Sequence, residues 1–162
     1  MRTLAVALAD AGATRRAGAA LGAALTPGMV VTLAGDLGAG KTTLARGVLS
    51  GCGWAGPVKS PSFALVEHYP LSNLYLYHFD FYRFDEPGEW DDAGFADCFR
   101  DDSVCLVEWP ERVASRLPAA DVAISLAYAG PEHEGRTLDA VATTEAGERC
   151  LSAIAAAMGV AR

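Results

Sequence analysis

The nine residues GDLGAGKTT, positions 35–43, constrain the fold of this chain more than any other stretch. They follow the apolar run 29–34 and lead into apolar residues at helical spacing, so we expect a buried strand, a glycine-rich loop and a helix. Glycines at 35, 38 and 40 allow backbone conformations that a Cβ would exclude. Backbone N–H groups of such a loop converge on an anion at the start of the helix. The stretch therefore predicts a phosphate-binding unit.

The same loop satisfies the GxxxxGK(S/T) pattern of nucleotide-binding P-loops, and the predicted strand and helix around it are the context that this pattern requires. We expect Lys41 to act as a binding and catalytic residue at the β and γ phosphates, and the Thr42 hydroxyl to ligate Mg²⁺. A glycine-rich turn that only begins a helix is the alternative, which these flanks disfavour. The predicted phosphate-binding residues are Gly35, Asp36, Leu37, Gly38, Ala39, Gly40, Lys41, Thr42 and Thr43.

Two acids at the ends of predicted strands are candidates for metal binding and catalysis. Glu108 ends the apolar run SVCLVE, and the carboxyl end of a buried strand is where α/β sheets bind ligands. In NLYLYHFDFYR, alternation places Asp80 on one face with Leu76 and His78, and aromatic side chains on the other, where we expect core packing. Asp80 is either a site residue or the polar end of that row, and Glu108 alternatively faces water. We expect His78 to be a hydrogen-bonded strand residue rather than a catalyst.

Hydrophobic periodicity predicts helices alternating with strands in the first half and hairpins later. The predicted strands span 3–9, 29–35, 62–69, 73–83, 103–108, 121–129 and 136–143, and the longer helices span 13–25, the segment after the loop, and 144–158. The linker PLSN is too short for a crossover, so the third and fourth strands should be antiparallel. The expected fold is α/β and P-loop NTPase-like, a single domain over residues 1–162, with a mixed sheet of parallel core and antiparallel hairpins flanked by helices.

Composition disfavours two classes of partner. The formal net charge of −7 argues against the broad basic face that binds nucleic-acid backbones, so we expect no strong direct nucleic-acid binding. Charged or polar residues interrupt every apolar run before the ~20 residues of a membrane span. The four cysteines are scattered without metal-like spacing, which is typical of reduced thiols in a cytoplasmic protein. We therefore expect a cytoplasmic protein without membrane contact.

Four blocks of the sequence resemble, in order, the motifs of the TsaE family, formerly YjeE. The blocks are LAGDLGAGKTTLARG, VKSPSFALVEHY, YHFDFYR and LVEWPER, between residues 33 and 112. The preceding segment ATRRAGAALGAALTPG is similar to the family's N-terminal helix, where Thr14 and Gly18 match recurring positions. Members of the family are small bacterial ATPases that take part in forming N6-threonylcarbamoyladenosine (t6A) on tRNA.

The resemblance implies a role for each matching position, with ATP and Mg²⁺ as cofactors. Glu108 would be the acidic Mg²⁺ and catalytic residue, and Asp80 the second essential acid. Trp109 would lie near the nucleotide and Thr14 near the adenine. Ser60, Pro61, Ser62 and Phe63 would form a switch-like segment, in which SPSF replaces the usual SPTF. The family acts with the TsaD–TsaB pair. The chain would therefore hydrolyse ATP weakly by itself, and together with those partners it would allow them multiple turnovers.

Three other functions use the same loop. A small-molecule kinase usually needs a lid that carries Arg, and Arg100, Arg112 and Arg116 form no obvious lid segment. A GTPase needs an NKxD-type guanine motif, which the sequence lacks. A nucleotide-binding scaffold differs from a slow ATPase only in rate, so the sequence does not separate the two. The sequence also leaves open the oligomeric state, the partner surface, and which of the two acids activates water.

Overall fold

The computed structural model describes residues 2–61, 63–86, 88–130 and 135–160. Within these residues the chain forms strands β1 (Arg2–Leu8), β2 (Val30–Ala34), β3 (Val66–Pro70), β4 (Tyr75–Asp80), β5 (Ser103–Glu108), β6 (Val122–Tyr128) and β7 (Arg136–Ala142). The helices are α1 (Ala11–Ala24), α2 (Lys41–Gly51), α3 (Gly88–Ala93) and α4 (Glu145–Ala157), with short 3₁₀ turns at Phe95–Cys98 and Pro110–Val113. Among the residues described, no helix is long and apolar enough to cross a membrane.

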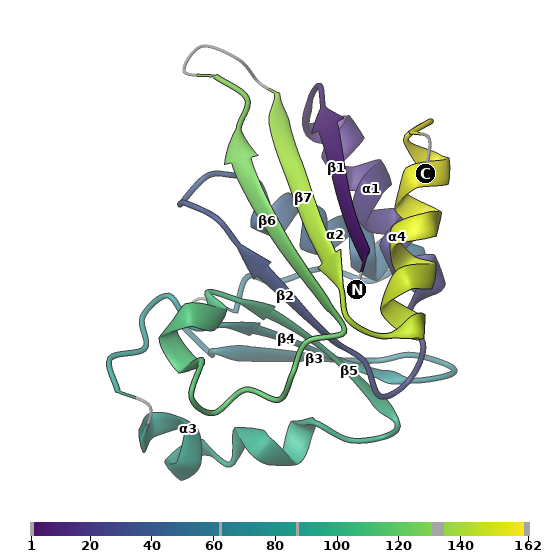
Figure 1. Ribbon diagram of the computed structural model, residues 1–162. Coiled ribbons are helices and arrows are strands. Elements are labelled where there is room, and N and C mark those ends of the chain that lie inside the picture. Colours follow the sequence, from purple (N-terminus) through teal and green to yellow (C-terminus); the bar gives the residue numbers. More distant parts are fainter. Residues whose placement is uncertain (1, 62, 87, 131–134, 161–162) are drawn as a thin grey trace.

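The strands form one mixed sheet in the order β1-β7-β6-β2-β5-β4-β3 (Figure 1). Its centre is parallel, because β2 runs parallel to β6 and β5, and β5 parallel to β4. Its margins are antiparallel, with β7 between β1 and β6, and β3 against β4. The predicted parallel core with antiparallel hairpins is confirmed. The carboxyl ends of β6, β2, β5 and β4 therefore meet at one edge of the sheet.

The clearest difference from the predicted elements lies at the third strand. The sequence predicts a strand from residue 62, whereas β3 begins at Val66. Leu65 has a left-handed φ of 68°, and its N–H donates to the Pro61 carbonyl at 2.7 Å. The chain therefore turns before it enters the sheet.

Two hydrophobic clusters cover the two faces of the sheet. Helices α1, α2 and α4 lie on one side of it (Figure 1), where Leu76 and Leu106 belong to the larger cluster. On the other face, Phe79 and Phe81 form an aromatic cluster with Trp90 of α3. The alternation predicted for β4 is confirmed. Phe79 and Phe81 are core packing as expected, whereas Tyr75 on the same face is 40% exposed.

Four glycines bring α1 and α2 into backbone contact. A Cβ on any of them would overlap a carbonyl oxygen of the facing helix: Gly18 faces Leu44, Gly22 faces Val48, Gly47 faces Arg15, and Gly51 faces Ala19. This close approach holds α1 against the helix that follows the phosphate loop. As a result, Thr14 lies beside the loop, where a Cβ on Gly40 would be 3.8 Å from its Cγ2.

We expect Gly47→Ala to destabilise the protein by ~1–3 kcal/mol, because overpacking a rigid contact forces the two helices apart. Alanine stabilises an isolated helix by up to about 1 kcal/mol relative to glycine, so helix propensity alone gives the opposite sign. Urea unfolding measures the difference. Gly88→Ala is the matched control, because a Cβ at Gly88 meets nothing within 4 Å. Equal stability of Gly47→Ala and wild type would contradict the close-packed interface.

Candidate functional site

The carboxyl ends of β2, β5 and β4 bring the phosphate loop and both predicted acids together. Asp80 and Glu108 are direct partners in the β4–β5 pairing, and Glu108 also pairs with Leu33, just before the loop. Asp80 shares its face with Leu76, and Glu108 shares its face with Leu106, in the cluster that α1 and α2 cover. Both acids are buried, with 8% and 2% of their surface exposed. The structure thus places two buried carboxylates on the α2 side of the sheet.

The phosphate loop has the backbone geometry that its glycines predict. Gly35, Gly38 and Gly40 have φ values of 144°, 78° and 107°, which L side chains rarely adopt. Gly40 is the residue before α2, so the helix begins directly at Lys41. The first N–H groups of a helix have no acceptor within it and are available to an anion. The half-buried Thr42 lies among them, in the first turn.

Lys41 folds back onto the loop. Its Nζ donates to the carbonyl oxygens of Gly35 at 2.5 Å and Asp36 at 2.8 Å, and it lies 4.4 Å from the centre of the Trp109 ring. Burial lowers the pKa of Lys41, while the nearby carboxylates of Glu108 and Asp80 act in the opposite direction. The cation is therefore poorly solvated and lies between the loop and the acids.

Glu108 accepts a hydrogen bond from His78. His78 Nε2 and Glu108 Oε2 are 2.6 Å apart, and the two side chains are only 1% and 3% exposed. The prediction that His78 is a hydrogen-bonded strand residue is confirmed. Its partner is the candidate catalytic acid, which the sequence did not indicate.

Asp80 is held at the end of β4 by backbone contacts. Its Oδ1 accepts from the Tyr82 N–H at 3.0 Å, and its own N–H donates to the Leu65 carbonyl at 3.0 Å. Burial raises the pKa of Asp80, and the neighbouring Glu108 acts in the same direction. The two acids thus resist being charged together.

The predicted switch-like segment lies next to Asp80. It comprises Ser60, Pro61, Ser62 and Phe63, of which Ser62 lies outside the described residues. Phe63 is 85% exposed, and the Arg83 guanidinium lies 4.8 Å from its ring centre. Leu65 joins this segment to the strand that carries the acid, because its N–H donates to the Pro61 carbonyl and its own carbonyl accepts from the Asp80 N–H.

Trp109 follows Glu108 at a sharp turn. Its φ is 57°, and its ring lies 4.9 Å from that of Tyr82 in addition to its contact with Lys41. The resemblance implies that Trp109 lies near the nucleotide, and the structure places its ring beside the P-loop lysine.

A small cavity of about 100 Å³ lies beside the phosphate loop. It is lined by Ala11, Thr14, Gly38, Gly40, Thr43 and Arg136. Thr14 and Thr43 therefore lie at the same hollow, although they come from different helices. The structure thus places Thr14, Asp80, Glu108 and Trp109 around the phosphate loop at one edge of the sheet.

Comparison with known proteins identifies the family. The model of "Threonylcarbamoyl adenosine biosynthesis protein TsaE" matches residues 8–138. The chain belongs to the TsaE family. The tRNA threonylcarbamoyladenosine biosynthesis protein TsaE of Haemophilus influenzae is 44% identical over 125 residues, which cover 77% of each chain. The protein of the same name from Bacillus subtilis is 41% identical over 115 residues, covering 71% of this chain and 72% of its own.

A solved structure agrees with this membership. The crystal structure of Bacillus subtilis YdiB matches with a TM-score of 0.74 at 31% identity. The match covers 96% of this chain and 95% of that one. The mixed sheet described above is therefore shared with a solved protein over nearly its whole length.

Arg136 is a contact of the TsaE loop that the sequence did not reveal. From the start of β7, its guanidinium donates to the carbonyl oxygens of Ala39 at 3.1 Å and Gly38 at 3.2 Å. It also lies 4.2 Å from the ring centre of Tyr128, whose hydroxyl donates to the Leu37 carbonyl at 3.4 Å. The β6–β7 pair therefore ties down the phosphate loop from outside the motif.

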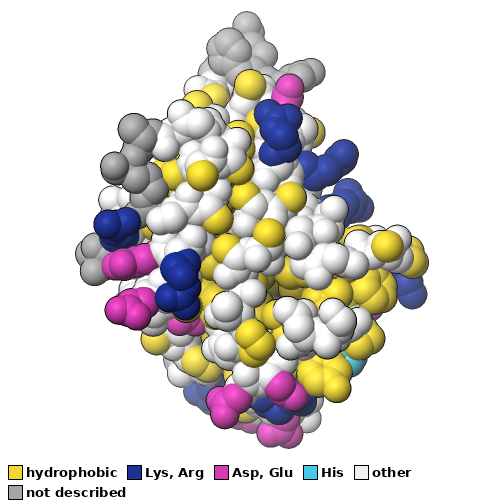
Figure 2. Space-filling model, turned by 90° about the vertical axis from the view of Figure 1, so that its right-hand side faces the viewer, with side chains coloured by type: hydrophobic (Ala, Val, Ile, Leu, Met, Phe, Trp, Pro, Cys, Tyr) yellow, Lys and Arg dark blue, Asp and Glu magenta, His cyan; other side chains and the backbone are white. Residues whose placement is uncertain are grey.

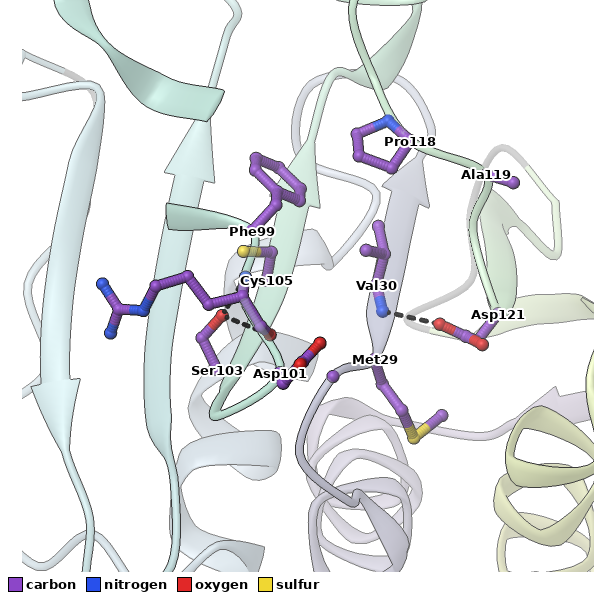
Figure 3. Close-up of a pocket in the computed structure, with 11 residues that line it drawn as sticks. Met29, Val30, Phe99, Asp101, Ser103, Cys105, Pro118, Ala119 and Asp121 are labelled. Atoms are coloured by element: carbon purple, nitrogen blue, oxygen red, sulfur yellow. Dashed lines mark hydrogen bonds between the residues drawn. The ribbon is translucent and has the colours of Figure 1, made fainter. Parts of the chain in front are cut away.

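A second cavity, of about 310 Å³, lies at the amino ends of β2 and β5 (Figure 3). Two of its polar side chains have partners: Asp121 accepts from the Val30 N–H at 2.8 Å (Figure 3), and Ser103 donates to the Cys98 carbonyl at 2.6 Å. No predicted site residue lines it. These hydrogen bonds hold neighbouring segments of the fold together. The candidate site of this TsaE protein is therefore the edge of the sheet that carries the phosphate loop.

Figure 2 shows how the charged side chains are distributed over one face of the protein. Lys and Arg side chains lie there in small groups, separated from each other by uncharged and hydrophobic side chains and interspersed with acids. On this face, the described side chains form no continuous basic surface of the kind that follows a nucleic-acid backbone.

Without nucleotide or metal, we expect Asp80→Asn to raise the free energy of unfolding at neutral pH. Because the pKa of Asp80 is raised by burial, the folded state keeps its proton to a higher pH than the unfolded state. Wild-type stability therefore falls as pH rises from about 4, the unfolded pKa, through the raised folded pKa. Asp80→Asn has no carboxyl group to ionise, so its stability does not fall in this pH range. Its amide oxygen still accepts from the Tyr82 N–H.

Urea unfolding in EDTA at acidic and at neutral pH measures this gap, which should be largest at neutral pH and shrink toward about pH 4. The control is Asp92→Asn, on the exposed surface of α3, which should change stability little at either pH. A variant less stable than wild type at neutral pH would overturn the prediction.

Proposed function

We propose that this chain binds and hydrolyses ATP with Mg²⁺, and that it does so as a subunit required for t6A modification of tRNA. Membership of the TsaE family supports the pathway, since relatives carry that biosynthetic role in their names. The observation that carries the activity is the meeting of the phosphate loop, Glu108 and Asp80 at one edge and on one face of the sheet.

The residues of this edge fit a Mg–nucleotide. The positive φ values of the loop create a cradle of backbone N–H groups, and oxygen donors from Thr42 and Glu108 are of the type that Mg²⁺ prefers. The described residues contain no group of three or more His, Cys, Asp or Glu that could hold a metal. This agrees with Mg²⁺, which is bound by one or two protein side chains together with phosphate oxygens. When bound, Mg²⁺ would neutralise charge on the transferred phosphate.

Each predicted residue then has a task in hydrolysis. Lys41 leaves the carbonyl oxygens of the loop to bind the β and γ phosphates. Glu108 would hold the Mg²⁺ ion. Asp80, whose pKa is raised, orients the attacking water or accepts its proton. Thr14, beside Gly40, lies near the base of the nucleotide, and Trp109, beside Lys41, lies near its phosphates.

We place the hydrolysis step in a complex with TsaD and TsaB in the cytoplasm. The chain is acidic, with a net charge of −7, so its partners would supply the contact with tRNA. Leu37 and Phe63 are 59% and 85% exposed beside the site, which supports docking of a partner where the switch-like segment lies. If the site is completed only when a partner binds, the chain by itself hydrolyses ATP slowly.

The test measures ATP hydrolysis by the chain alone and with purified TsaD and TsaB, and counts t6A formed on tRNA per complex. We expect the partners to stimulate hydrolysis and the chain to raise t6A above one turnover. The matched control uses ADP in place of ATP. ADP should support neither phosphate release nor more than one turnover of t6A formation. Phosphate transfer to a metabolite instead of water would show a kinase, and unlimited turnover without the chain would refute the role in t6A formation.

A further inference from the structure

His78 and Glu108 form a buried pair that the proposed chemistry does not yet explain. His78 pairs with Leu106 in the β4–β5 register, so Glu108 lies two residue pairs closer to the phosphate loop. The carboxylate nevertheless bonds to the imidazole at 2.6 Å, away from the loop edge. A buried carboxylate is costly unless it is hydrogen-bonded, and His78 supplies that bond.

The two nitrogens of His78 are used unequally. A carboxylate only accepts, so Nε2–H is the donor to Glu108 Oε2. Nδ1 is buried and has no hydrogen-bond partner among the described residues. Buried polar atoms are normally paired, and a histidine that only filled the core would lose free energy through this nitrogen. The ring is therefore placed to serve Glu108.

The backbone on either side of Glu108 is fixed as well. Its carbonyl accepts from the Phe81 N–H at 3.2 Å, and the next N–H, of Trp109, donates to the Leu33 carbonyl at 3.3 Å. Only the side-chain torsions of Glu108 remain to be set, and the bond from His78 sets them. With Oε2 held by His78, Oε1 is the oxygen of Glu108 that is not bonded to the imidazole.

We propose that His78 is a positioning residue, which holds the Glu108 carboxylate with Oε2 toward the sheet interior and Oε1 toward the phosphate loop. The proposal rests on the proposed function of Glu108, but the contact itself does not. His78 acts through Glu108 and does not touch the nucleotide, because its side chain is buried in the sheet and only 1% exposed. In proteins, groups that orient a catalytic or metal-binding side chain in this way commonly change activity by 10–100-fold.

The test compares His78→Leu with His78→Gln in steady-state ATP hydrolysis with the partners present. Leucine removes the donor, whereas the glutamine amide donates from nearly the same position as Nε2. We expect His78→Leu to lower kcat by about 10–100-fold with little change in KM, and His78→Gln to recover most of that loss. Equal kcat in His78→Leu and wild type, or equal losses in both variants, would overturn the proposal.

A second measurement does not depend on ATPase activity. Urea unfolding of His78→Leu, Glu108→Gln and the double variant forms a cycle in the protein without nucleotide. We expect the stability loss from His78→Leu to be larger when Glu108 is present than in the Glu108→Gln background, because only the former leaves a buried carboxylate unpaired. Equal losses would overturn the contact. If the cycle shows coupling and wild type hydrolyses no ATP, the proposed function fails and the positioning contact stands.

Discussion

Lys41→Ala is expected to weaken ATP binding by roughly 10- to 100-fold, the range set by loss of a hydrogen bond to a charged group. The cation lies between the loop carbonyls and the acids, so its removal leaves Glu108 and Asp80 facing the phosphates without a countercharge. The loss should grow with the number of phosphates on the ligand. Calorimetric titration with ATP, ADP and AMP measures that dependence directly.

Lys59→Ala is the matched control, since Lys59 is the other lysine of the sequence and is exposed. It should leave all three affinities unchanged. A uniform loss for ATP, ADP and AMP in Lys41→Ala would instead indicate a collapsed loop, which a lower unfolding midpoint would reveal. Unchanged ATP affinity would remove Lys41 from the phosphate site.

Much of the fold could be predicted because the deciding signals are local. The continuous apolar run of β5 indicates a strand buried on both faces, and the alternation in β4 separates Leu76 and Asp80 from Phe79 and Phe81. The start of β3 could not be predicted in the same way. Its turn at Leu65 depends on the bond from the Asp80 N–H, which joins two segments that only the folded sheet brings together.

The candidate site likewise combines residues that local sequence signals indicate with contacts that only the folded sheet creates. Lys41, Glu108 and Asp80 could be predicted because each ends or begins an element whose direction the sequence indicates. The bond between His78 and Glu108 depends on the register of β4 against β5, and register is a tertiary property. Arg136 reaches the loop only because β7 pairs with β6, whose end lies beside the P-loop. No spacing in the sequence indicates either contact.

Glu108→Gln is expected to lower kcat by about 10²–10⁴-fold, because charge stabilisation by a bound metal contributes several kcal/mol and each ~1.36 kcal/mol is a factor of ten in rate. ATP binding should change little, because Lys41 and the backbone N–H groups of the loop remain. The glutamine side chain has nearly the same shape and can still accept from His78, so the change removes charge and basicity while leaving the packing intact. The effect should therefore fall on the step in which the phosphate is cleaved.

Pre-steady-state mixing of the variant with ATP and the partners separates binding from cleavage. We expect a normal binding phase, no burst of phosphate, and a complex trapped with intact ATP. Glu111→Gln is the control, because Glu111 is an exposed acid shortly after Glu108 and carries the same change in charge. A phosphate burst of wild-type rate in Glu108→Gln would show that cleavage does not need Glu108, and would leave Asp80, whose pKa is raised, as the acid that acts on the attacking water.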